Sequence, residues 1–344
     1  MSRKLLFVVS GFLASLVLAE IVLRIFPVAT GYGYKPVNAE EPVLRGTALA
    51  PYTYSLGWNF RRVSHGMLNN DGFISDRNYK PSVGNGVLLV GDSYVQAAAV
   101  PENLNLHAQL ATRLRPVEVA GISRAGGALP DYVAMARWGV ARYHTGVLIV
   151  LIVSGDVADS LTPKTGGYYF QQTDQGYVQT RVDRAPLGCV QETLNKSMLF
   201  RYLYDNLAFT VNFPTRPQIP AIAVAGDMAK QEKYGQVCEF FLGHLLQILP
   251  REKIVLLIHR SRKSGTFVYD TDVDVLRDNA LQRGFRVLDL GPLFTEYEGR
   301  NRQRLDSSPV DTHWNILAQQ FVADELAPQL RDILHDGGSE RVPR

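Results

Sequence analysis

A serine, an aspartate and a histidine in this chain have the types and positions that nucleophilic catalysis requires. Ser93 lies in the segment Gly-Asp-Ser-Tyr (91–94), directly after the apolar run 87–90. Asp311 and His313 lie near the other end of the chain, in Asp-Thr-His-Trp-Asn (311–315). A hydroxyl, a general base and a group that orients the base are the three parts of an activated serine nucleophile. The sequence therefore predicts Ser93 as the nucleophile, His313 as the base and Asp311 as its orienting acid.

Each of these residues also has a structural interpretation. Asp92 or Ser93 could cap a helix, and Asp311 could open the helix that begins near residue 314. The spacing of Asp311 and His313 favours the catalytic interpretation, because residues i and i+2 of an extended segment project to the same side. His259 is an alternative base, since it follows the apolar run 254–258. Its basic neighbours, Arg260 among them, instead indicate a solvated or anion-facing loop.

Apolar runs alternate with helical patterns over most of the chain, which predicts a three-layer, doubly wound parallel sheet of the α/β class. The long run 147–153 is typical of a strand buried on both faces. The predicted strands are 87–90, 117–120, 147–153, 254–258 and 285–290, and the predicted helices are 104–114, 131–140, 241–249 and 314–334. Ligands of such sheets bind at the carboxyl ends of the strands, where Ser93 would lie.

The N-terminus is a candidate membrane segment. Arg3 and Lys4 precede an apolar run over 5–26, close to the ~20 residues that span a bilayer. A signal peptide cut after Ala19 is the alternative, but the apolar run resumes after Glu20. We expect an uncleaved, single-pass anchor in a bacterial inner membrane, with the N-terminus in the cytoplasm and the rest in the periplasm or outside the cell. Secretion after cleavage is the second possibility.

The remaining chain divides by pattern. Residues 1–27 form the expected anchor, 28–85 a juxtamembrane extension without sustained periodicity, 86–336 the catalytic domain and 337–344 a mobile tail. An insertion over 160–225 interrupts the strand–helix alternation. The two cysteines, Cys189 and Cys238, could form a disulfide that staples this insertion to the following helix, or could be two unrelated buried thiols.

Composition excludes several classes of function. The 344 residues carry a net charge of +3, and 46% are apolar. There is no basic stripe with interleaved aromatic residues, so nucleic acid is not expected as a partner. The turn at Ser93 lacks the glycines and lysine of a phosphate loop, which argues against a nucleotide-binding flavodoxin-like protein. Neither cysteine is expected to bind a metal, and no cofactor is expected.

The segment around Ser93 and the C-terminal Asp-x-His-Trp-Asn together resemble the SGNH/GDSL hydrolase family, over about residues 86–334. The resemblance implies a flavodoxin-like fold with Ser93 as nucleophile and His313 as base. The Asp-x-His spacing is similar to that of polysaccharide O-acetyltransferase relatives, which makes Asp311 the orienter. The anchor and the segment Asn-Asp-Gly-Phe (70–73) resemble a bacterial membrane-anchored branch associated with modification of cell-surface polysaccharides.

The family's oxyanion hole uses a glycine after the second strand and an asparagine after the third, and here the sequence departs from it. The backbone N–H of Ser93 is expected to be one donor of this chain. A further donor is expected at Gly121, or at Arg124, where the family glycine could fall. At the second position Gly155 replaces the asparagine, and loss of such a donor typically costs ~3 kcal/mol of transition-state stabilisation. Ser154 or the insertion could compensate; otherwise the enzyme is slow or inactive.

These observations predict a serine-dependent esterase or acyltransferase that acts on an acylated, most specifically an O-acetylated, cell-surface glycan or a small ester. A transferase would need a membrane-bound partner that delivers its acyl donor. The alternative is a catalytically inactive scaffold with the same fold in a polysaccharide-assembly complex.

Overall fold

A five-stranded parallel sheet forms the centre of the computed structural model, which describes residues 3–82, 85–207, 227–263, 266–267, 271–308 and 311–336. The strand order is β11 (Arg286–Asp289), β8 (Ile254–His259), β5 (Thr145–Val153), β3 (Gly86–Gly91) and β4 (Val119–Ser123). All four neighbouring pairs are parallel. The five predicted strands are therefore present, although β4 begins later and ends later than its apolar run indicated.

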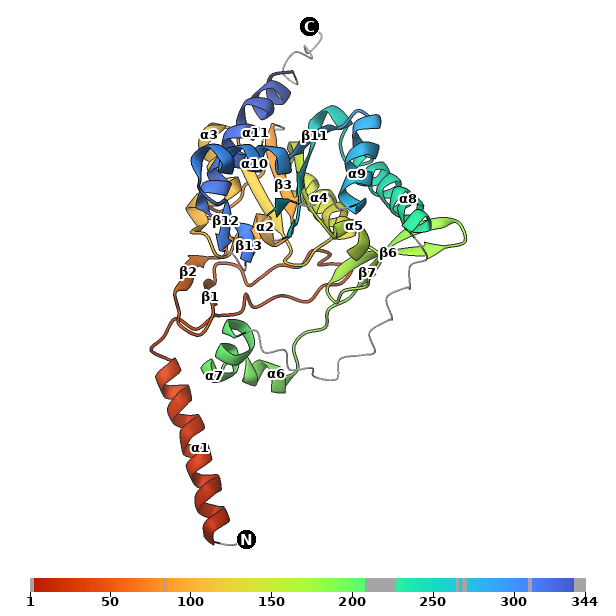
Figure 1. Ribbon diagram of the computed structural model, residues 1–344. Coiled ribbons are helices and arrows are strands. Elements are labelled where there is room, and N and C mark those ends of the chain that lie inside the picture. Colours follow the sequence, from red (N-terminus) through yellow and green to blue (C-terminus); the bar gives the residue numbers. More distant parts are fainter. Residues whose placement is uncertain are drawn as a thin grey trace.

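Helices cover both faces of this sheet and make three layers (Figure 1). Alternate residues of β3 point to opposite faces: Leu88 and Val90 join one buried cluster, and Val87 and Leu89 join the other. This double burial explains why the strands read as continuous apolar runs. The first face carries α4 (Leu129–Tyr143), α8 (Asp227–Leu246) and α9 (Thr271–Gln282); the second carries α3 (Leu106–Arg113), α10 (Leu290–Asn301) and α11 (Ile316–Asp336).

The remaining elements are short and lie mostly at the edges of the sheet. Three antiparallel hairpins are formed by β1 (Pro51–Leu56) with β2 (Arg62–Met67), β6 (Gly167–Thr173) with β7 (Gly176–Val182), and β12 (Asp306–Ser308) with β13 (Asp311–Trp314). A two-residue pair joins β9 (Arg262–Lys263) to β10 (Thr266–Phe267). The short helical elements are α2 (Ser93–Gln96), α5 (Asp156–Asp159), α6 (Cys189–Leu194), α7 (Met198–Arg201), η1 (Glu102–Leu104), η2 (Tyr202–Asn206) and η3 (Arg251–Lys253).

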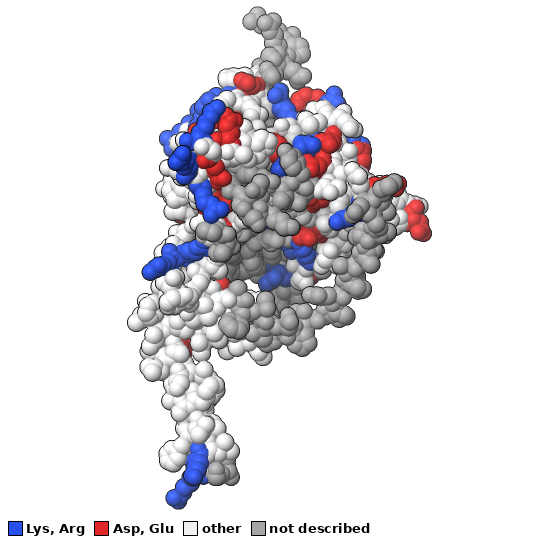
Figure 2. Space-filling view, in the orientation of Figure 1, with Lys and Arg blue, Asp and Glu red and all other residues white. Residues whose placement is uncertain are grey.

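The N-terminal helix α1 (Arg3–Leu23) projects away from the domain, and it is long and apolar enough to cross a membrane (Figure 1). Most of it is uncoloured in Figure 2, with basic atoms at the end far from the domain. The same length and composition would also fit a signal sequence. Near its C-terminal end Glu20 pairs with Arg24 at 2.8 Å, as the i, i+4 spacing predicts.

The helix α1 is not wholly separate from the rest of the chain. The Glu20 carboxylate accepts hydrogen bonds from the Ser197 hydroxyl and from the backbone N–H groups of Met198 and Leu199. These bonds tie α1 to the start of α7, in the predicted insertion. Residues 208–225 of that insertion and the predicted tail 337–344 lie outside the described residues.

The predicted disulfide is wrong. Cys189 and Cys238 are both free thiols. Cys189 is exposed at the start of α6, on the side of the molecule from which α1 projects, whereas α8, which carries Cys238, packs against the sheet (Figure 1). Cys238 belongs to the buried cluster on the first face of the sheet. It is therefore an unpaired buried thiol, which was the alternative to the disulfide.

Candidate active site

Ser93 is the first residue of α2, at the carboxyl end of β3, which lies between β5 and β4 in the sheet. The turn into α2 is tight: a Cβ at Gly91 would lie 2.6 Å from Val95 and 3.1 Å from the Leu151 Cβ, so this position requires glycine. The Asp92 carboxylate caps the helix by accepting the Tyr94 N–H at 2.9 Å. Capping and placement of Ser93 at the rim therefore coexist, with Asp92 supplying the cap.

The three predicted residues meet at this rim. His313 Nε2 lies 2.8 Å from Ser93 Oγ, and His313 Nδ1 lies 2.7 Å from Asp311 Oδ1. Asp311 Oδ1 also accepts the backbone N–H of His313 at 3.2 Å. Both residues belong to β13, whose extended backbone puts their side chains on one side, as the i, i+2 spacing predicts. The contacts have the order and lengths of a hydroxyl, base and acid relay.

The electrostatics of the site agree with this arrangement. The hydrogen bond that His313 Nδ1–H donates to Asp311 raises the pKa of His313 above its usual value, although burial opposes the shift. The same hydrogen bond lowers the pKa of Asp311. On the other carboxylate oxygen, Arg62 Nη1 lies 3.4 Å from Asp311 Oδ2. Asp311 is therefore an ionised acceptor that favours the protonated imidazole, the form in which a base holds the proton that it has taken.

Two buried carboxyl groups, those of Asp92 and Asp156, lie near one another next to Ser93. Asp92 and Asp156 are both buried, and Asp156 accepts the Tyr132 hydroxyl and the Val153 N–H, each at 2.8 Å. Burial raises the pKa of Asp92, and burial together with the negative charge of Asp92 raises the pKa of Asp156 well above its usual value. Asp156 is therefore the carboxyl group of this pair that retains a proton most readily.

His259 does not reach the serine. It is 2% exposed, and its Nδ1 accepts the Trp314 indole N–H at 3.3 Å. Arg260, the next residue, is not solvated, contrary to the sequence prediction. The Arg260 side chain is 3% exposed and pairs with Asp289 at 2.6 Å and with Asp274 at 2.9 Å. This basic residue is buried because two carboxylates of neighbouring elements surround it.

The three residues predicted for the oxyanion hole are engaged elsewhere. The Gly121 N–H donates to the Tyr79 hydroxyl at 3.0 Å, because Tyr79 closes the open edge of β4. The Arg124 N–H continues the strand ladder to the Gly91 carbonyl at 3.1 Å. The Gly155 N–H donates to Asp272 at 2.8 Å. The hydroxyl oxygen of Ser154, the predicted substitute, accepts the Ser261 N–H at 2.8 Å, and its O–H is still able to donate.

In the described part of the chain, backbone N–H groups without a partner line the cavity that holds the Ser93 hydroxyl, and Ser93 and Ala125 supply two of them. Among the residues that the structure describes, the N–H groups of Ser93 and Ala125 have no hydrogen-bond partner. Both residues line one cavity of about 270 Å³ together with His313. Ser93 was expected to contribute its N–H, whereas Ala125 was missed. Ala125 could have been found from its position, because it immediately follows Arg124, whose N–H, directly after β4, makes the last hydrogen bond to β3.

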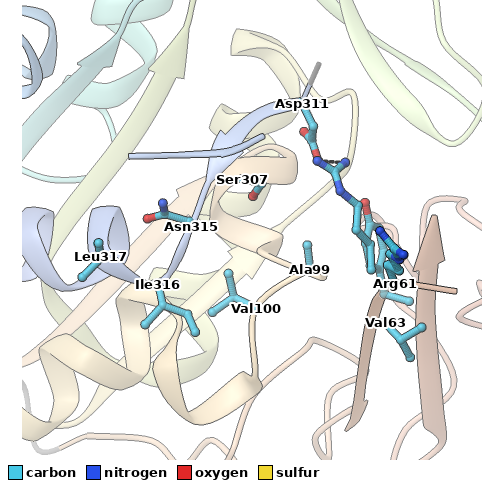
Figure 3. Close-up of a pocket in the computed structure, with 11 residues that line it drawn as sticks. Arg61, Val63, Ala99, Val100, Ser307, Asp311, Asn315, Ile316 and Leu317 are labelled. Atoms are coloured by element: carbon cyan, nitrogen blue, oxygen red, sulfur yellow. Dashed lines mark hydrogen bonds and ion pairs between the residues drawn. The ribbon is translucent and has the colours of Figure 1, made fainter. Parts of the chain in front are cut away.

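The walls of this cavity come largely from residues that sequence patterns did not single out. Tyr32 and Tyr54 of the segment 28–85 line it, as does Trp314. A second cavity, of about 430 Å³, adjoins it at Tyr54, Ala99 and Val100 and contains Asp311 (Figure 3). The predicted juxtamembrane extension is therefore part of the site. Within the described ranges, no group of three or more His, Cys, Asp or Glu side chains could hold a metal ion.

No family model matches the chain, and no curated protein matches its sequence. Several solved structures match its fold at low identity. An acetyl xylan esterase is 14% identical, with 70% of this chain and 97% of that one covered and a TM-score of 0.39. A lipase/acylhydrolase from Enterococcus faecalis is 13% identical, with 73% and 96% covered and a TM-score of 0.40.

A member of the lipolytic G-D-S-L family from Veillonella parvula is 9% identical, with 72% of this chain and 96% of that one covered and a TM-score of 0.38. These matches include an esterase, a lipase/acylhydrolase and a member of the lipolytic G-D-S-L family, the family that the segments around Ser93 and His313 resemble.

Proposed function

We propose that the protein cleaves ester bonds through an acyl-enzyme on Ser93. The observation that carries this proposal is the unbroken series of contacts from Ser93 Oγ to His313 Nε2 at 2.8 Å and from His313 Nδ1 to Asp311 at 2.7 Å. If this series of contacts had only a structural role, its residues would not need to line a cavity. Here Ser93 and His313 both line one.

In the proposed reaction, His313 Nε2 takes the Ser93 proton as Oγ attacks the ester carbonyl. The negative charge that develops on the carbonyl oxygen is held by the N–H groups of Ser93 and Ala125. Collapse of the tetrahedral intermediate breaks the bond to the alcohol, which leaves with the proton from His313. Water or a second hydroxyl then attacks the acyl-enzyme, gives its proton to His313 and regenerates the Ser93 hydroxyl.

The substrate that we propose is an acylated, specifically O-acetylated, cell-surface glycan. This part rests on the sequence resemblance and on α1, which would hold the domain outside the cytoplasm at a bacterial inner membrane. With water as the acceptor the protein is an esterase. With a sugar hydroxyl as the acceptor it is an acyltransferase, and a membrane-bound partner must supply its acyl groups.

A catalytically inactive scaffold in a polysaccharide-assembly complex is the second candidate. The observation that favours it is the loss of the expected oxyanion donors, because Gly121, Arg124 and Gly155 all donate elsewhere. Each missing donor would cost about 3 kcal/mol of transition-state stabilisation, or roughly two orders of magnitude in rate. The two candidates therefore differ in whether Ser93 reacts at all.

A fluorophosphonate probe on the detergent-extracted full chain distinguishes them. The enzyme should be labelled at Ser93 and should hydrolyse a simple acetyl ester. Ser93→Ala should lose labelling and about 10³-fold or more of the turnover. Ser261→Ala is the matched control, because this serine is exposed near the same rim and its hydroxyl makes no bond within the described residues. A folded chain that resists the probe supports the scaffold, and equal turnover in wild type and Ser93→Ala rejects the nucleophile.

A further inference from the structure

The 430 Å³ cavity beside the triad is positively charged and has no assigned role. Figure 3 shows Arg61 and Val63 on one side of it and Asn315, Ile316 and Leu317 on the other, with Asp311 at its upper end. It adjoins the cavity of Ser93 and His313 through three shared residues, Tyr54, Ala99 and Val100. A molecule bound at Ser93 can therefore extend into it.

The charge of this cavity comes from β2 and the residue that precedes it. Arg61 and Arg62 line the cavity, and among the described residues that line it Asp311 is the one that is acidic. Arg62 approaches Asp311 at 3.4 Å, through the carboxylate oxygen that His313 does not use. Arg61 is exposed, and no ion pair engages its guanidinium within the described part of the chain. Two guanidinium groups face one carboxylate whose charge is shared with His313, so the cavity keeps a positive excess.

The rest of the cavity suits a small ring with polar substituents. Val63, Val100, Ile316 and Leu317 provide an apolar wall. Ser307 adds a hydroxyl that has no partner among the described residues. The Asn315 side chain is already committed, since it caps α11 through Ala318 and donates to the carbonyls of Arg304 and Asp306. Arg61 is therefore the group in this cavity with the most unused hydrogen-bonding capacity.

We propose that this cavity binds a carboxylate on the alcohol side of the ester, so that the substrate is an O-acylated acidic sugar. The proposal rests on the proposed function for the position of the ester. The acyl group occupies the cavity of Ser93, and the sugar ring lies against the apolar wall. The sugar carboxylate accepts hydrogen bonds from Arg61, whose planar fork matches a carboxylate. Arg62 contributes charge while it remains near Asp311.

Binding to the Ser93→Ala variant tests the subsite without requiring turnover. Calorimetry compares acetylated glucuronic acid with acetylated glucose, which differ at one carboxylate. We expect the acidic sugar to bind more tightly, and Arg61→Gln to lower the ratio of the two affinities about fivefold, the upper range for an exposed ion pair. The ratio should also fall in high salt, which screens exposed charges. Arg300→Gln removes an exposed arginine of α10, away from the cavity, and should leave the ratio unchanged.

Equal binding of the two sugars, or an equal fall of the ratio in the Arg61→Gln and Arg300→Gln variants, would overturn the subsite. Tighter binding of acetylated glucose 6-phosphate than of acetylated glucuronic acid would overturn the assignment to a carboxylate. Failure of the proposed function is a separate result: it shows as absence of Ser93 labelling, whichever sugar binds.

Discussion

Replacement of Asp311 by asparagine tests the central contact of the site. The change keeps the shape of the side chain and removes its charge. In the wild type Asp311 Oδ1 accepts both His313 Nδ1–H at 2.7 Å and the His313 backbone N–H at 3.2 Å. Two bonds therefore favour an orientation of the new amide in which its oxygen still faces the imidazole. In that orientation Nδ1 stays protonated and Nε2 stays free to accept the Ser93 proton.

The size of the effect follows from these bonds. A hydrogen bond to a charged group contributes about 1.5–3 kcal/mol, against about 1 kcal/mol for a neutral one. The charge is lost from Asp311, whose side chain is 11% exposed, so solvent screens it little and the larger part of that difference applies. A loss of about 1–2 kcal/mol corresponds to roughly a 5- to 30-fold fall in kcat/KM. A much larger fall, near 10⁴-fold, would mean that the amide has turned and fixed the wrong imidazole tautomer.

The pH profile of kcat/KM on a neutral acetyl ester is the second readout. His313 acts as a base only when neutral, so activity is present above its pKa and is lost as the pH falls through it. Asp311 raises the pKa of His313, which places the acid limb of the wild type above the ordinary histidine value of about 6.5. Asp311→Asn removes this shift, and the limb should move to lower pH.

Arg62→Gln is the matched control, because it removes the positive charge that lies beside the other carboxylate oxygen of Asp311. Loss of a nearby positive charge favours protonated His313, so in this variant the acid limb should stay in place or move to higher pH. The reasoning is refuted if Asp311→Asn leaves both kcat/KM and the acid limb unchanged, or if the two variants move the limb in the same direction.

Three further predictions follow from the fold. Tyr79→Phe should lower the free energy of unfolding in urea by about 1–3 kcal/mol, because the Gly121 N–H and carbonyl at the edge of β4 lose their buried partner. Tyr297→Phe, which removes a longer and exposed hydrogen bond, should lower the free energy of unfolding clearly less. Equal losses in the two variants would contradict the role of Tyr79 at this edge. Thiol titration should count one reactive cysteine in the native chain and two after denaturation without reductant, since Cys189 is exposed and burial raises the pKa of Cys238. A count of no thiols after denaturation would show that the two cysteines form a disulfide after all. Mass spectrometry of the membrane-extracted protein should find residues 1–19 still attached, whereas a mature chain that starts at Glu20 would identify a cleaved signal.

The sequence alone was sufficient to predict the sheet and the contacts among Ser93, His313 and Asp311. Apolar runs such as 147–153 identify the strands of the sheet, because a strand that is covered on both faces has no positions that favour polar residues. Ser93 could be placed because it follows such a strand, and Asp311 and His313 because extended backbone sends residues i and i+2 to one side. These inferences depend on local geometry, which a short stretch of residues determines.

Tertiary structure decided which backbone donors are free and what surrounds the triad. The N–H of Arg124 is engaged because β4 pairs with β3, and that of Gly121 because Tyr79, far away in sequence, reaches the edge of the sheet. Cys189 and Cys238 stay apart because their helices pack in different parts of the molecule. The hairpin that brings Tyr54 and Arg62 to the site shows no clear alternation, since its strands are only partly buried. Contacts between distant segments carry no local pattern, so only the folded chain reveals them.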